Sequence, residues 1–136
     1  MTFDPTVDYP LGSRRPDLVE TPSGLALDEV TLEAAQAGTL VAADVRATAA
    51  TLGRQAAVAR AAGRRQLADN LERAAELVGV PDDQLLEIYT ALRPGRSTAV
   101  ELEAWARRLD DWSAPQTAAF VREAAVAYAA RGLVGG

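Results

Sequence analysis

Residues 73–98, which read RAAELVGVPDDQLLEIYTALRPGRST, decide the fold of this chain. One helix ends at Gly79, and a second begins at Pro81, which an acidic pair follows in the first turn. The second helix ends at the turn of residues 93–95, and a capping-box pattern at Thr98 begins a third. Leucine and isoleucine recur at helical spacing between these signals, so the stretch predicts an all-α chain of short helices.

The same signals divide the rest of the chain. Thr48 is a candidate N-cap, and Ser113 with Gln116 forms a second capping-box pattern around Pro115. Residues 39–45 fit either a short extended piece or a turn. We expect an open array of five or six short helices, over residues 28–37, 48–62, 64–78, 81–92, 98–112 and 114–131.

The first 27 residues form a segment of different character. Four prolines exclude a long helix there, yet the segment carries eight large apolar residues, more than a free disordered tail usually holds. We expect an extended Pro-rich arm, residues 1–27, laid against the helical domain, residues 28–136, or against another subunit. A floppy terminus is the alternative.

Composition restricts the chemistry of the 136 residues. There is no Cys, His or Lys, and all 14 basic residues are Arg. These absences exclude disulfides, the usual zinc ligands, Ser-His and Cys-His nucleophile pairs, Schiff-base lysines and P-loop lysines. Because 29 of the 66 apolar residues are Ala, the chain has little large apolar surface to bury and is expected to rely on a partner for part of its stability.

Charge and hydropathy indicate which partners to exclude. Net charge is −5 and the arginines are scattered, so we expect no nucleic-acid surface. No apolar run is long enough to cross a membrane, and the start of the chain has no signal-peptide pattern. The sequence predicts a soluble, intracellular protein that binds no membrane.

Some residues have both a structural and a functional interpretation. Trp105 and Trp112 share one helical stripe, so we expect core packing, with a protein–protein hot spot as the alternative.

Arg93 and Arg96 flank a turn, where they would cap the carbonyls of the preceding helix or pair with carboxylates of another subunit. Tyr89 and Tyr128, on apolar faces, are expected in the core or an interface with satisfied hydroxyls, and the acidic pairs are interpreted as helix ends rather than metal ligands.

Several stretches together resemble one known family. They are DYPL (8–11), TPSG (21–24), LDEVTLE (27–33), DVR (44–46), AGR (62–64), LA (67–68) with Asn70, the run 73–98, and AAFVREAA (118–125). In this order and spacing they resemble the small subunit of adenosylcobalamin-dependent diol and glycerol dehydratases, over residues 8–128.

The resemblance implies a fold, an activity and partners. It implies a helical small subunit bound to a large (β/α)₈-barrel subunit, with a medium subunit completing a dimer of heterotrimers. Adenosylcobalamin would lie between the large and medium subunits, where a radical reaction dehydrates a 1,2-diol or glycerol to an aldehyde, which makes the holoenzyme a lyase. No catalytic, cofactor-binding or metal residue is carried over to this chain.

The sequence departs from the family pattern at Gly95, where an aromatic residue is usual, and at Thr90, where Asn is usual. Both are expected to lie in a loop region that contacts the large subunit. Only seven residues precede Asp8, so no amphipathic extension of the kind found in microcompartment members is expected, and the prediction is a cytoplasmic enzyme. The rival hypotheses are a stand-alone helical adaptor, with the Trp105/Trp112 stripe as its groove, and an independent enzyme limited to carboxylates, Arg and Tyr.

Overall fold

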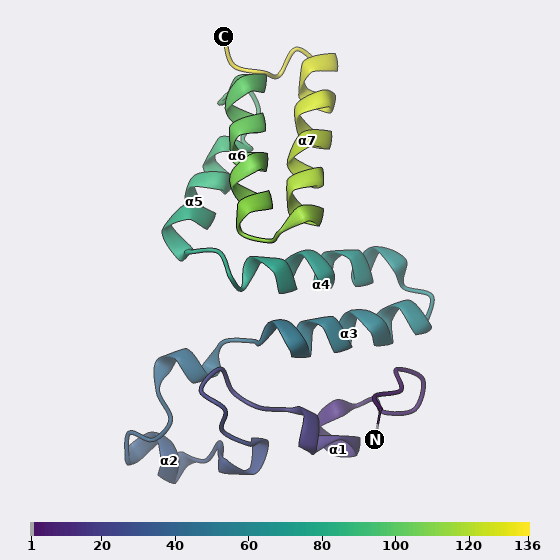
Figure 1. Ribbon diagram of the computed structural model, residues 1–136, viewed down its shortest axis with the longest axis vertical. Helices are drawn as coiled ribbons and strands as arrows, with labels where there is room; N and C mark the ends of the chain where they lie inside the picture. The colour runs from purple at the N-terminus through teal and green to yellow at the C-terminus, as the bar shows by residue number, and fades with distance from the viewer. Residues whose placement is uncertain (1) are drawn as a thin grey trace. The chain divides into compact units, whose positions relative to one another are not determined.

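The computed structural model describes residues 2–136, and the all-α prediction is confirmed (Figure 1). The part described holds seven α-helices, several 3-10 turns and one isolated antiparallel bridge, between Glu20 and Ala26. The helices are α1 (Leu11–Arg14), α2 (Leu32–Gln36), α3 (Ala49–Ala61), α4 (Arg65–Leu77), α5 (Asp82–Ala91), α6 (Ala99–Asp111) and α7 (Pro115–Ala130).

The chain divides into two compact units, and the boundary lies inside α4. Unit 1 spans Met1–Ala75 and unit 2 spans Glu76–Gly136. The division predicted from the sequence, an arm of residues 1–27 and a domain of residues 28–136, stays a prediction.

Unit 2 is built around the antiparallel pair of α6 and α7 (Figure 1). Leu102, Leu109 and Val121 are its fully buried large side chains. Leu102 and Leu109 are seven positions apart and therefore lie on the same face of α6. Arg122 crosses from α7 to two carboxylates of α6, at 3.0 Å from Glu103 and 2.8 Å from Asp110. These carboxylates raise the pKa of Arg122. The other buried members of the core are Val80, Ile88, Ala106, Ala114 and Ala118.

The start of α7 differs from the sequence prediction. Ser113 does not cap this helix; it takes a left-handed conformation, with φ of 59°, in the turn after α6. The cap comes from Glu76, whose carboxylate accepts hydrogen bonds from the backbone N–H groups of Gln116 (3.0 Å) and Thr117 (2.9 Å). It also accepts one from the Thr117 hydroxyl at 2.9 Å. The capping box expected at Ser113 is therefore wrong, because a carboxylate 40 residues away satisfies these donors.

Unit 1 contains a hairpin of α3 and α4, joined by a tight turn (Figure 1). Gly63 has a φ of +77° in this turn, a conformation that favours glycine. Arg60 in α3 then reaches two carboxylates of α4, at 3.2 Å from Asp69 and 2.5 Å from Glu72. The predicted cap of α3 is confirmed, since the Thr48 hydroxyl accepts a hydrogen bond from the Thr51 backbone N–H.

The N-terminal segment of unit 1 has no long helix, as predicted, although α1 and a 3-10 turn (Pro16–Leu18) interrupt its extended parts. Buried Arg15 pairs with Asp8 at 3.0 Å and with Asp17 at 2.8 Å, and these carboxylates raise its pKa. The Arg54 side chain of α3 donates a hydrogen bond to the Leu18 carbonyl at 2.7 Å. Polar contacts therefore hold this segment against α3.

Candidate functional site

The distribution of buried side chains differs sharply between the two units. Among the described residues of unit 1, the buried apolar side chains are Leu11 and three alanines, Ala56, Ala59 and Ala68. Alanine removes little apolar area from water, so these residues stabilise unit 1 only weakly. Unit 2 has its own apolar core, although Leu86, Val100 and Val126 are exposed on its surface. Unit 1 differs in that its exposed apolar side chains are not matched by a comparable buried core.

The exposed apolar surface of unit 1 gathers in residues 25–47, which we call the open segment. Asp44 is its sole buried residue. Leu32 is 70% exposed and Val45 is 78% exposed, and Leu27, Val30 and Val41 are also exposed. Five large exposed apolar side chains within 23 residues favour an interaction surface, since isolated monomers rarely leave much apolar surface open to water.

The Asp44 carboxylate fixes the backbone conformation of the open segment. One carboxylate oxygen accepts a hydrogen bond from the Ser23 backbone N–H at 3.2 Å, and the other accepts one from the Val41 backbone N–H at 3.0 Å. The Ser23 side chain, the Val41 backbone N–H and the Thr21 side chain all bond to this carboxylate and lower its pKa to about 2. Asp44 therefore stays ionised near neutral pH and joins two turns distant in sequence.

A second apolar surface of unit 1 is an open groove along the α3–α4 hairpin. It has a volume of about 420 Å³ and is lined mainly by Tyr9, Val58, Ala59, Ala62, Leu67 and Leu71. Tyr9 and Leu67 are themselves exposed. Gln55 and Arg64 also line the groove. An open and mainly apolar groove of this kind suits a protein contact better than the orientation of a small substrate.

The two tryptophans lie in unit 2. Trp105 and Trp112 are half-buried and pack against its core, which confirms the core interpretation. The Arg108 guanidinium lies 4.8 Å from the centroid of the Trp105 ring and 5.8 Å from that of Trp112, within cation–π range of both.

The tyrosines of unit 2 differ from each other. The Tyr128 hydroxyl donates a hydrogen bond to the Leu92 carbonyl at 2.6 Å, which confirms the expectation that this hydroxyl has a partner. Tyr89 is 59% exposed and therefore belongs to the surface rather than to the core. Thr90 lies within α5, where its hydroxyl donates to the Leu86 carbonyl, and not in a loop.

Arg93 and Arg96 do not cap the preceding helix. Ser97 and Tyr128 perform this role: the Ser97 hydroxyl donates to the Ala91 carbonyl at 2.8 Å, beside the bond from Tyr128 to Leu92. The interpretation of the two arginines as C-terminal caps is wrong, since shorter side chains already reach these carbonyls. Both guanidinium groups are exposed.

Within residues 2–136, no three acidic side chains lie close enough to form a metal site. The acidic pair of residues 82–83 lies in the first turn of α5, where the helix dipole favours it. None of the described helices has the length and apolar composition needed to span a membrane.

Sequence reasoning missed the roles of Asp44 and Glu76. Asp44 directly follows the pair Ala42-Ala43 in a segment without periodicity, and Glu76 stands within an ordinary amphipathic helix. The nearest signal was at Asp44, whose position three residues after Val41 lets its carboxylate accept from the Val41 backbone N–H at the start of a 3-10 turn. No local pattern points to Glu76, because its partners lie 40 and 41 residues away.

Known proteins similar to this chain are named as small subunits of dehydratases. A sequence model of the family described as dehydratase small subunit matches residues 5–134. The propanediol dehydratase small subunit of Citrobacter freundii is 51% identical over 125 residues, which cover 91% of this chain and 73% of that protein. The propanediol dehydratase small subunit of Salmonella typhimurium is also 51% identical over 125 residues, covering 91% of this chain and 72% of that protein. The exposed apolar side chains of unit 1 are consistent with a subunit that binds other chains. The extent of these matches shows that the chain belongs to the dehydratase small subunit family.

Proposed function

We propose that this chain is the assembly subunit of an adenosylcobalamin-dependent dehydratase that converts propane-1,2-diol or glycerol into an aldehyde. In this proposal it binds and stabilises a large (β/α)₈-barrel subunit, and a medium subunit completes each half of a dimer of heterotrimers. The printed name of the two relatives, propanediol dehydratase small subunit, supports the substrate class.

The observation that carries the assembly role is the burial pattern of unit 1. Its single large buried apolar side chain among the described residues is Leu11, whereas five large apolar side chains of the open segment are exposed. Covering these side chains with another subunit would remove their apolar area from water, at roughly 25 cal/mol per Å². A chain that supplied a catalytic site alone would not need such a surface.

The residues of this chain do not fit the cobalamin cofactor. It has no His or Cys to act as a cobalt ligand, and the groove on the α3–α4 hairpin is open and mainly apolar, with Gln55 and Arg64 as its polar lining residues. We therefore assign cofactor and substrate binding to the other subunits, and no step of the reaction to residues of this chain.

The first experiment tests the need for this subunit. The large and medium subunits of the same organism are purified with and without this chain, and aldehyde formation from propane-1,2-diol is measured with added adenosylcobalamin. We expect little stable activity without this chain, and restored activity when it is co-expressed. Full and stable activity in its absence would contradict the assembly role.

The second experiment locates the interface. Leu32→Asp with Val45→Asp places charges on two exposed side chains of the open segment, where neither should disturb the isolated chain. Burying those charges in an interface is costly, so we expect this variant not to co-purify with the large subunit. The matched control is Val126→Asp on α7, which is 73% exposed. Equal loss of assembly in both variants would argue against the open segment as the interface.

A further inference from the structure

One end of unit 2 is basic although the chain as a whole is acidic. Residues 91–98 and residues 128–136, which we call the arginine tip, contain three arginines, Arg93, Arg96 and Arg131, and no acidic residue. The neighbouring carboxylate of Glu101 contacts the tip at Thr98, from which it accepts hydrogen bonds, so the arginines still outnumber the carboxylates there. The whole chain has 19 acidic residues against 14 arginines. The tip is therefore a local positive surface within a chain of net charge −5.

Backbone contacts hold the two parts of the arginine tip together. The Gly95 N–H donates to the Leu133 carbonyl at 2.6 Å, and the Gly135 N–H donates to the Ser97 carbonyl at 2.7 Å. A Cβ atom at Gly135 would lie 3.2 Å from the Ser97 carbonyl carbon and 3.3 Å from Arg96 backbone atoms, so the tail is seated directly on the turn. Arg131 is thus on a segment fixed beside the turn that carries the other two arginines.

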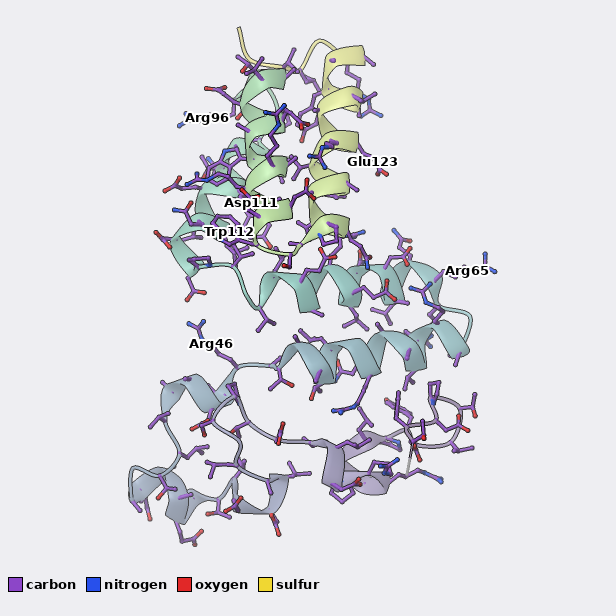
Figure 2. All side chains as sticks on the ribbon, viewed as in Figure 1. Arg46, Arg65, Arg96, Asp111, Trp112 and Glu123 are labelled. Atoms are coloured by element: carbon purple, nitrogen blue, oxygen red, sulfur yellow. The ribbon has the colours of Figure 1, made fainter. Side chains whose placement is uncertain are left out.

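The three guanidinium groups differ from the arginines that stabilise the fold. Arg15, Arg60 and Arg122 each bridge two carboxylates. The side chains of the arginine tip are exposed and make no ion pair with any described residue, and Arg96 extends away from the helices (Figure 2). Their donors remain available, and a guanidinium group suits bidentate pairing with carboxylates.

We propose that the arginine tip binds a carboxylate-rich segment of a partner dehydratase subunit, which pairs with Arg93, Arg96 and Arg131. This inference rests on the proposed function. Val100, in the first turn of α6 beside the tip, is 80% exposed and offers an apolar contact next to the charges. A protein partner fits better than a nucleic acid, because a chain of net charge −5 repels an extended polyanion.

The experiment uses the co-expressed complex of all three subunits. The variant Arg93→Gln/Arg96→Gln/Arg131→Gln removes three charges from the tip, and the control Arg14→Gln/Arg65→Gln/Arg107→Gln removes three from exposed arginines elsewhere. Each complex is passed over a gel-filtration column at NaCl concentrations from about 50 mM to about 1 M, and the release of the small subunit is measured. We expect the tip variant to be released at a several-fold lower salt concentration than the control, and a triple Arg→Lys variant of the tip to recover part of the difference.

The outcomes separate this inference from the proposed function. If the wild-type chain does not co-purify with the large and medium subunits, the proposed function fails. If it co-purifies, but the tip variant and the control are released at the same salt concentration, the inference about the arginine tip is wrong and the proposed function stands. Circular dichroism of the released subunits checks that the substitutions at these exposed positions leave the helices intact.

Discussion

At the residue scale, two carboxylates hold parts of the chain that are far apart in sequence. Asp44 joins the turn at Ser23 to the turn at Val41, and Glu76 holds the start of α7. Each accepts hydrogen bonds from backbone N–H groups that no helix or strand satisfies. Removing either carboxylate therefore leaves backbone donors without partners.

Replacing Glu76 by Ala should destabilise the folded chain. The variant loses the acceptor for the N–H groups of Gln116 and Thr117, and the loss of a helix cap costs about 1 kcal/mol. Urea denaturation measures the free energy of unfolding. Glu123→Ala, an exposed helical position that Figure 2 labels, is the control and should change stability little. Similar stability losses in both variants would contradict the capping role.

The ionisation of Asp44 predicts a dependence on acid. Because the folded chain lowers the pKa of Asp44 to about 2, its stabilising contribution is complete above the ordinary aspartate pKa of about 4 and is lost as the pH falls toward about 2. The protection of the Ser23 and Val41 amides from hydrogen exchange, measured relative to the intrinsic exchange rate at each pH, should therefore fall over this interval. In Asp44→Asn, which has one carbonyl oxygen for two N–H donors, the same amides should be weakly protected at every pH. A wild-type chain whose protection does not fall down to a pH of about 2 would refute this prediction.

At the element scale, the sequence predicted most helix positions, because caps and breakers are local signals. The Thr98–Glu101 capping box is present, and α3 to α7 lie within one or two residues of their expected bounds. The helix expected to begin at Asp28 begins at Leu32 instead, because a 3-10 turn comes first and the Thr31 hydroxyl then caps α2.

The parts that could not be predicted from the sequence depend on distant partners. Whether Arg93 caps α5 depends on where Ser97 and Tyr128 fold back, which helical periodicity does not encode. The exposure of the open segment could not be predicted either, because its mixture of apolar and charged residues does not show which apolar side chains lack a partner within the chain. The residues did predict that the chain has few large apolar side chains and relies on a partner for part of its stability.

The C-terminal end of α5 offers a test at this scale. Ser97→Ala should lower the free energy of unfolding by about 1 to 3 kcal/mol, because it leaves the Ala91 carbonyl without its buried hydrogen-bond donor. Tyr128→Phe should cost about 1 kcal/mol through the lost bond to the Leu92 carbonyl. Chemical denaturation measures both variants, with Ser13→Ala at an exposed site as control. A Ser97 variant as stable as this control would show that another donor replaces the hydroxyl.

At the scale of the whole molecule, the two units have different means of stabilisation. Unit 2 excludes water from a core of leucine, isoleucine and valine. Unit 1 depends on ion pairs, polar clamps and alanine contacts. Exposed ion pairs contribute little in water, so the stability of unit 1 should depend more strongly on its neighbours in the assembled enzyme.

This contrast predicts a difference in hydrogen exchange. In the isolated chain, amides of α6 and α7 should exchange slowly, and amides of the open segment should exchange faster, because few apolar contacts oppose local opening. In the complex with the large and medium subunits, the open segment should become the region that gains the most protection. Mass spectrometry of peptides from both states measures this. Equal protection of the open segment in both states would contradict its burial in the complex.

The single buried carboxylate of the open segment also has a consequence for how fast the enzyme forms. Asp44 fixes the backbone between residues 21 and 45 through hydrogen bonds, so this stretch is already ordered before it meets another subunit. Less conformational entropy is then lost when the subunits bind. If the chain assembles as proposed, this preorganised stretch should make encounters with the large subunit succeed more often. Weakening this one side chain should slow association while leaving the final contacts of the complex unchanged.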